Sequence, residues 1–258
     1  MNYELRQYSF GETIGKGFNL YFNNFISIVL VSILCQIPVA ILMAGMSSDL
    51  SQGTIGASYF INFGLFFFTS IIVSAFLSAY IIHVVSKRFL ETNPTNQDTI
   101  SRSILPYVFP IIGLSIVVGL VTMLGAIFLI IPGIIIALGY SLATEVMVIE
   151  QQKIGESMKR SWSLTKGKKG HIFLICLVSG IITVCIDQPL TWMLGLLKMD
   201  PQLTIYLTYL VSAITAPFSA CILVVVYFNI RIEKEGFNIE HLAQQFTLAD
   251  QPGPSVEN

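Results

Sequence analysis

Three ionisable residues lie inside long apolar stretches of the sequence: His83, Glu145 and Asp187. A charged side chain is costly in an apolar medium, so such residues are the first candidates for binding a proton, a cation or a substrate. Each residue also has a structural interpretation in which it does no chemistry. Its position along the apolar stretch decides between the two.

Glu145 lies a little more than one helical turn before the polar stretch that begins at Glu150. Its carboxylate is suited to binding a proton or a cation. We expect instead that it pairs with a base of that stretch, such as Lys159 or Arg160, or reaches the lipid headgroups.

Asp187 lies deeper along its apolar stretch and is followed by Gln188 and Pro189. We therefore expect it to cap a short helix over residues 189–196. If Asp187 faces the protein interior instead, it is the best candidate in the chain for contact with a substrate or ion. His83 is suited to relaying protons, but we expect it to be a histidine at the membrane interface.

The polar stretch from Glu150 to His171 carries six of the 14 Lys and Arg residues. Each base near an anionic membrane surface contributes about 1 kcal/mol of attraction. The candidate contacts with anionic lipid are Lys159, Arg160, Lys166, Lys168 and Lys169. The alternative is that these bases only determine the topology.

Motifs of enzymes and metal sites are missing from the sequence, which has no GxSxG, no HExxH and no Gly-rich phosphate loop. The four cysteines all lie in apolar stretches without a ligand at metal-binding spacing, and we interpret them as packing residues: Cys35, Cys176, Cys185 and Cys221. We expect no enzyme activity, no cofactor and no metal. Nucleic acid is not an expected partner, because it needs a larger basic face.

The composition indicates an integral membrane protein, because 54% of the residues are hydrophobic and only 11% are charged, against about 25% charged in soluble domains. Residues 104–149 contain one charge, and a single helix of that length would extend about 69 Å, over twice the hydrocarbon thickness. We expect a turn at Ile131-Pro132-Gly133. The six predicted spans cover residues of about 22–45, 59–85, 104–131, 133–149, 171–196 and 203–228.

The distribution of bases predicts the orientation. Thirteen of the 14 Lys and Arg residues lie before the first span, in alternate joints and in the C-terminal segment, whereas the intervening joints hold only Lys198. This pattern predicts a multi-pass protein of the cell (inner) membrane with both termini in the cytoplasm.

Three polar segments share one pattern of residue types and begin at Glu12, Asp98 and Glu156. The pattern predicts a threefold repeat of an amphipathic interfacial helix followed by a helical hairpin; the alternative is chance recurrence of short heptamers. The interfacial helices are predicted at about 10–20, 97–103, 154–165 and 237–247, in one membrane domain over 1–249 with a disordered tail over 250–258.

Two sets of small residues recur at a spacing of four, which lets helices approach closely: Ser70, Ser74 and Ser78, then Ser212, Ala216 and Ala220. We expect them to pack against other helices rather than to line a pore. Pro38 and Pro217 are expected to bend their helices.

Several motifs resemble one known family. They are ESMKRSWSLTKG at Glu156–Gly167, the segment Arg231–Glu240, the Ile131–Ile134 stretch and Phe10-Gly11-Glu12. Together they are similar to the membrane domain fused to some bacterial glycerophosphodiester phosphodiesterases, and to its stand-alone relatives, over about Tyr8–Leu242. The resemblance implies a multi-helix bacterial membrane protein with a link to lipids. The phosphodiesterase chemistry belongs to a separate soluble barrel, which nothing in this chain supplies.

The sequence therefore predicts an all-α polytopic bundle that is a non-enzymatic, lipid-interacting or scaffold-like module. Its expected partners are membrane lipids and other membrane proteins. The alternative is a small transporter that uses bent helices and Asp187 or Glu145. A transporter predicts a water-accessible cavity that reaches one of these acids, whereas a scaffold predicts a closed bundle with capped or paired acids.

Overall fold

The computed structural model describes residues 8–53, 56–89, 97–197 and 199–235, which form helices and no strand. In chain order the helices are α1 (Phe10–Asn23), α2 (Phe25–Ser51), α3 (Ala57–Phe89), α4 (Gln97–Phe128), α5 (Ile130–Tyr140), α6 (Ala143–Ile149), α7 (Ile154–Thr165), α8 (Lys169–Leu196) and α9 (Pro201–Glu235). The predicted all-α fold is confirmed.

Within the described residues, six helical stretches are long and apolar enough to cross a membrane, as the sequence predicts. They are Phe25–Ser51, Ala57–Phe89, Ile104–Phe128, Ile130–Ile149, Lys169–Leu196 and Pro201–Glu235. Large apolar side chains face outward along them, and Trp192 near the end of α8 is 76% exposed. Such a surface suits lipid rather than water. The chain is therefore a multi-pass membrane protein.

The turn between α4 and α5 lies at Leu129, which has extended backbone angles (φ −163°, ψ 143°). The predicted turn at Ile131-Pro132-Gly133 is therefore wrong by a few residues. Pro132 is the third residue of α5, where its missing N–H removes no bond within the helix. Pro132 thus helps to begin a helix here instead of ending one.

The fourth span, predicted as a single helix over 133–149, consists of α5 and α6, with Ser141 and Leu142 in a turn between them. Two of the three predicted repeat units do show a separate helix before a long one. These helices are α1 before α2 and α7 before α8.

In the middle unit, residues 97–103 are the beginning of the continuous helix α4, so the separate helix predicted there is wrong. The other two units contain residues that stop a helix. The side chain of Asn24 donates to the carbonyl of Leu20 (2.9 Å), and Gly167 has φ +80°, in the left-handed region that favours glycine. The predicted helix over 237–247 and the tail from 250 lie outside the described residues.

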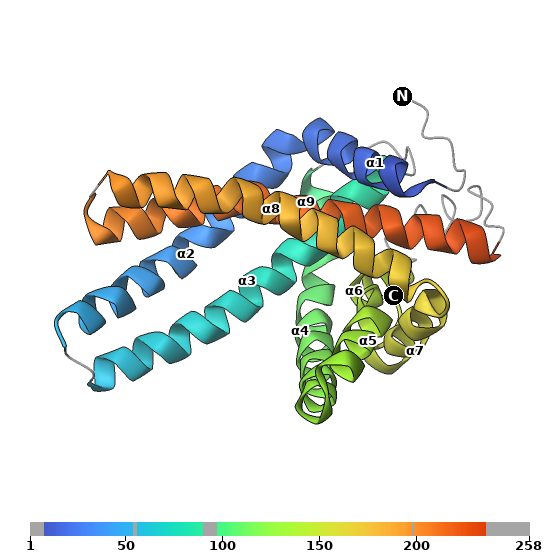
Figure 1. Ribbon diagram of the computed structural model, residues 1–258, viewed down its shortest axis with the longest axis horizontal. Coiled ribbons are helices and arrows are strands. Elements are labelled where there is room, and N and C mark those ends of the chain that lie inside the picture. The colour runs from blue at the N-terminus through green and yellow to red at the C-terminus, as the bar shows by residue number, and fades with distance from the viewer. Residues whose placement is uncertain (1–7, 54–55, 90–96, 198, 236–258) are drawn as a thin grey trace, which may run out of the picture.

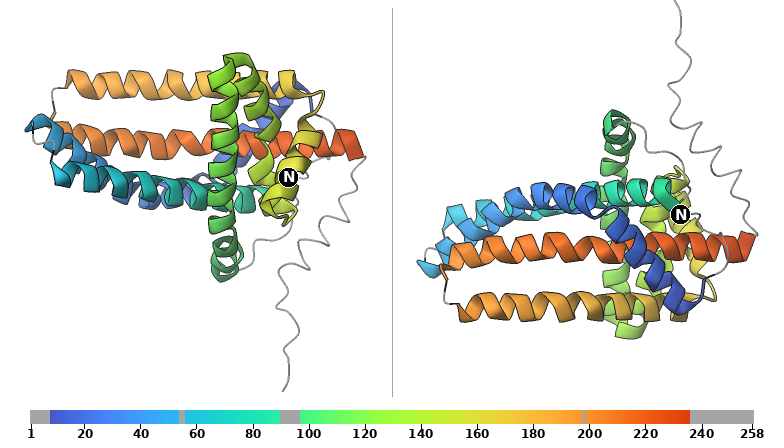
Figure 2. Two further views of the ribbon diagram at one scale, coloured as in Figure 1. Left: turned by 90° about the horizontal axis from the view of Figure 1, so that it is seen from below. Right: turned by 90° about the horizontal axis from the view of Figure 1, so that it is seen from above.

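The hairpins α2–α3 and α8–α9 extend in the same direction and have their turns at the same end of the molecule (Figure 1). The α4 helix lies at a steep angle to α8 and α9 in both views of Figure 2, and α5 folds back along it. A Cβ atom on Gly133 would lie 2.8 Å from the Cα atom of Ala126, so this glycine allows α4 and α5 to touch.

The central helix is α9. Half of its most apolar window is buried, against 11% for Ile104–Phe128. The α1 helix lies along α9 so closely that a Cβ atom on Gly17 would lie 2.5 Å from Cγ1 of Ile222. The chain before α1 is joined to α9 as well, because the Tyr8 N–H donates to Oδ1 of Asn229 (2.8 Å) and Nδ2 of Asn229 donates to the Tyr8 carbonyl (3.1 Å).

The basic ends of several elements meet at one end of the molecule. Phe89, the last residue of α3, stacks on Phe228 of α9 at 4.7 Å between ring centroids. Lys168, at the start of α8, forms an ion pair with Glu233 near the end of α9. The turns of the α2–α3 and α8–α9 hairpins lie at the opposite end (Figure 1).

Candidate functional site

The α7 helix presents one buried face and one exposed face to its surroundings. Glu156 lies in its first turn, where a carboxylate interacts favourably with the helix dipole. The buried residues of α7 are Ser157, Ser161, Leu164 and Thr165. The hydroxyls of Ser161 and Thr165 both donate to the carbonyl of Gly139, at 2.9 and 3.1 Å. These bonds fix α7 against the end of α5.

Arg160 joins α7 to two acids. Its Nε lies 3.1 Å from Oε2 of Glu150, and its Nη2 forms an ion pair with Oε1 of Glu235. Partial burial alone would lower the pKa of the guanidinium, but Glu150 and Glu235 outweigh it and raise the pKa above its ordinary value. Arg160 is therefore paired with acids of the protein, with 27% of its side chain exposed.

A second arginine shares the same acids. Arg231 donates from Nε to Oε2 of Glu235 (3.1 Å) and from Nη1 to the hydroxyl of Tyr227 (2.8 Å). The Tyr227 hydroxyl in turn donates to Oε1 of Glu150 (2.8 Å). The side chains of Arg160, Glu150, Tyr227, Arg231 and Glu235 form what we call the arginine cluster. Sequence analysis identified only Arg160 as a candidate.

Lys169 lies over the Trp162 ring, with Nζ 3.5 Å from the ring centroid, and donates to the carbonyl of Ile135 (3.2 Å). Trp162 is itself partly exposed and tilts against Tyr140, with 5.3 Å between ring centroids. No space separates this indole from α5, because a Cβ atom on Gly139 would lie 2.3 Å from it. A base over an indole is typical of a cation–π contact.

Lys159 and Lys166 differ from Arg160, Lys168 and Lys169, because both of their side chains are exposed. In the part of the chain that the structure describes, neither side chain forms an ion pair. The backbone around Lys166 is held in place, since Nζ of Lys234 donates to the carbonyls of Ser163 (2.9 Å) and Lys166 (2.7 Å). Five predicted lipid contacts thus divide into two exposed bases and three that have partners within the protein.

Glu145 lies on α6 and is only 4% exposed, and its buried Oε2 has no hydrogen-bond partner among the described residues. The expected pairing with Arg160 is wrong, because Arg160 binds Glu150 and Glu235. Glu150 is the first residue after α6 and so reaches the bases of α7, whereas Glu145 lies in the first turn of α6.

Asp187 lies inside α8, which continues through Pro189 to Leu196, so the predicted helix cap is wrong. Pro189 removes one bond of the ladder, to the carbonyl of Cys185, and this loss does not end the helix. The Asp187 carbonyl accepts a bond from the Thr191 hydroxyl (2.8 Å), while its buried Oδ1 has no partner among the described residues.

His83 is buried on α3 (7% exposed), among residues that pack in the core. The cavity between α2, α3 and α9 is lined by none of His83, Glu145 and Asp187. In the described ranges, no group of three His, Cys, Asp or Glu side chains is arranged to hold a metal ion.

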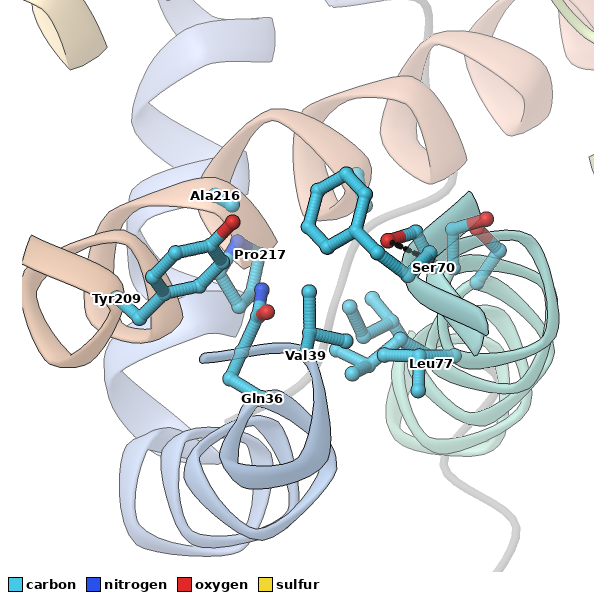
Figure 3. Close-up of a pocket in the computed structure, with 13 residues that line it drawn as sticks. Gln36, Val39, Ser70, Leu77, Tyr209, Ala216 and Pro217 are labelled. Atoms are coloured by element: carbon cyan, nitrogen blue, oxygen red, sulfur yellow. Dashed lines mark hydrogen bonds between the residues drawn. The ribbon is translucent and has the colours of Figure 1, made fainter. Parts of the chain in front are cut away.

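A cavity of about 360 Å³ lies between α2, α3 and α9 (Figure 3). Ser70, Ser74 and Ser78 line it from α3, and Ala216 and Ala220 line it from α9. These small residues were expected to pack closely, and instead they border an open space. The neighbouring Ala75 and Ala79 on α3 are buried in the core.

Comparisons with protein families, with curated proteins and with solved structures found no match to this chain.

Proposed function

We propose that the protein is a non-enzymatic, lipid-interacting module of the cytoplasmic membrane that presents α7 to anionic headgroups. The observation that carries this proposal is the exposure of Lys159 on α7 and of Lys166 just beyond its end, whereas Arg160 and Lys168 have partners in the protein. Trp162 supports it, since an exposed indole with a base over its ring suits the boundary between headgroups and acyl chains.

The proposed orientation places α7 and the end of α9 on the cytoplasmic side. The support is that α7 and the last turn of α3 each contain two bases and the last turn of α9 contains Lys234, and the contacts of α3, α8 and α9 bring these ends together. The turns of the α2–α3 and α8–α9 hairpins would then face the opposite side.

Transport through Asp187 or Glu145 is the competing proposal. Its prediction was a cavity that reaches one of these acids. The cavity between α2, α3 and α9 is lined by neither of them. This cavity therefore gives no support to transport through either acid, although both acids also lack, among the described residues, the caps or partners that the scaffold predicts.

The test is binding of the detergent-solubilised protein to phosphatidylglycerol, followed by native mass spectrometry. Lys159→Gln and Lys166→Gln are each expected to weaken binding about fivefold, since one base near an anionic surface contributes about 1 kcal/mol. Lys168→Gln is the matched control, because it removes the same charge two residues from Lys166 but from a base paired with Glu233.

The control variant is expected to bind within about twofold of the wild type. Equal losses in all three variants would show that only the total charge matters, and the proposed role of α7 would be rejected. Unchanged binding in Lys159→Gln and Lys166→Gln would also reject it.

A further inference from the structure

The cavity between α2, α3 and α9 is lined by residues within the membrane-length stretches of all three helices. Gln36 is roughly 17 Å along α2 from its start, and Tyr209 is roughly 12 Å along α9, at 1.5 Å per residue. Both positions lie in helical stretches long and apolar enough to cross the hydrocarbon layer, which is about 30 Å thick. The cavity is thus remote from α7 and independent of the arginine cluster.

Two polar side chains point into this apolar space. Figure 3 shows Gln36 on α2 beside Tyr209 on α9, with Ser70 on the opposite side from α3. Within the described chain, neither the Gln36 amide nor the Tyr209 hydroxyl has a hydrogen-bond partner. An unpaired amide or hydroxyl in an apolar environment costs about 1–3 kcal/mol, which a bound polar group would offset.

Two of the three serines that line the cavity offer acceptors rather than donors. The hydroxyl of Ser70 donates to the Phe66 carbonyl (2.7 Å), and that of Ser74 donates to the Ile71 carbonyl (2.9 Å). Unpaired donor hydrogens therefore come from the Gln36 amide, the Tyr209 hydroxyl and the hydroxyl of Ser78, which has no hydrogen-bond partner among the described residues. The site is suited to a ligand with a hydroxyl or carbonyl oxygen that accepts from them.

The lack of charged residues around the cavity argues against a charged ligand. None of the 13 residues that line the cavity is a Lys, Arg, Asp, Glu or His. An ion at this depth would lack a counter-charge, and its desolvation would be costly. The remaining lining is aliphatic or aromatic, as in Val39, Leu77 and Pro217.

We propose that this cavity binds one uncharged, single-chain amphiphile of the surrounding membrane, with its hydroxyl or carbonyl oxygen between Gln36 and Tyr209. The volume of about 360 Å³ lies near the lower end of the range of ligand pockets, about 300–1,000 Å³, and so suits one chain rather than a two-chain lipid. This binding is separate from the headgroup contacts of α7.

The experiment measures binding of monoolein to the detergent-solubilised full chain by native mass spectrometry. Oleoyl lysophosphatidylglycerol, which has the same chain and a charged headgroup, is the competing probe. Monoolein is expected to bind at least about tenfold more tightly, and Lys166→Gln is expected to leave its binding unchanged.

Ser70→Leu should fill the cavity and abolish monoolein binding. Ser115→Leu makes the same change on the exposed side of α4 and should bind as the wild type does. Tyr209→Phe keeps the shape of the ring and should weaken binding about threefold to tenfold through loss of one hydrogen bond. This variant tests the site even if Ser70→Leu fails to fold.

Undiminished monoolein binding in Tyr209→Phe, or in folded Ser70→Leu, would overturn the assignment. Equal binding of the charged probe would overturn the uncharged class of ligand. Either result would leave the proposed contact of α7 with phosphatidylglycerol standing, because that contact is measured with different variants.

Discussion

Lys159 and Arg160 are adjacent in the sequence and carry the same charge, yet their surroundings differ. Successive residues of a helix point about 100° apart, and here one side chain is exposed while the other binds Glu150 and Glu235. The stretch of bases could be predicted from the sequence. Which of these bases are exposed and which are paired could not be predicted, because Glu235 lies on another helix, far along the chain.

Gly17 provides a prediction at the same scale. Gly17→Ala should lower the free energy of unfolding by about 1–3 kcal/mol, because its Cβ atom would overlap Ile222 of α9. Thermal denaturation in detergent, followed by circular dichroism, measures this change.

Gly15→Ala is the matched control on the same helix, where an added Cβ atom meets nothing within 4 Å. It should stabilise α1 by about 0.5–1 kcal/mol, since alanine is the better helix former. Similar effects of both substitutions would contradict the close contact between α1 and α9.

Among the elements, α7 begins and ends where the sequence predicted, at Ile154 and Thr165. Its signals are local: an acid in the first turn and a glycine just beyond the end. The turn before α5 was misplaced, because proline stops a helix in most positions but is tolerated in the first turn. The turn at Ser141 and Leu142, between α5 and α6, has no comparable signal in the sequence.

The attachment of α7 to α9 predicts an effect of Arg160→Gln. Loss of its charge leaves Glu150, a largely buried carboxylate, with fewer partners, and should weaken the attachment by about 1–3 kcal/mol. Hydrogen exchange of the α7 amides should become correspondingly faster, while that of α2 stays the same.

Lys153→Gln removes an exposed base just before α7 and should leave this exchange unchanged. If Arg160→Gln exchanged no faster than Lys153→Gln, the arginine cluster would not be what holds α7 to α9.

For the whole molecule, the number of spans follows from the composition of consecutive residues, which is why it could be predicted. The steep angle of α4 to α8 and α9 could not, because it depends on how α4 packs against α3 and α5. The cavity was missed for a related reason. A row of small residues shows that helices can approach, but not whether they close the space between them.

Asn229→Ala tests how the first and last helices are joined. It removes both bonds to the backbone of Tyr8 and leaves buried polar groups unpaired, at a cost of about 1–3 kcal/mol. Hydrogen exchange in α1 should become faster. Asn23→Ala removes an exposed bond within α1 and should change the stability by less than about 0.5 kcal/mol; an equal effect of both variants would count against the Tyr8–Asn229 contact as the joint.

The contact of Tyr8 with Asn229 joins residues 221 positions apart. The ribosome makes α1 first and the surface on which α1 packs last. Throughout synthesis, α1 must therefore wait beside the membrane while the intervening spans are inserted. Only the arrival of α9 lets it dock, so the earliest of the described helices is among the last of them to reach its final place.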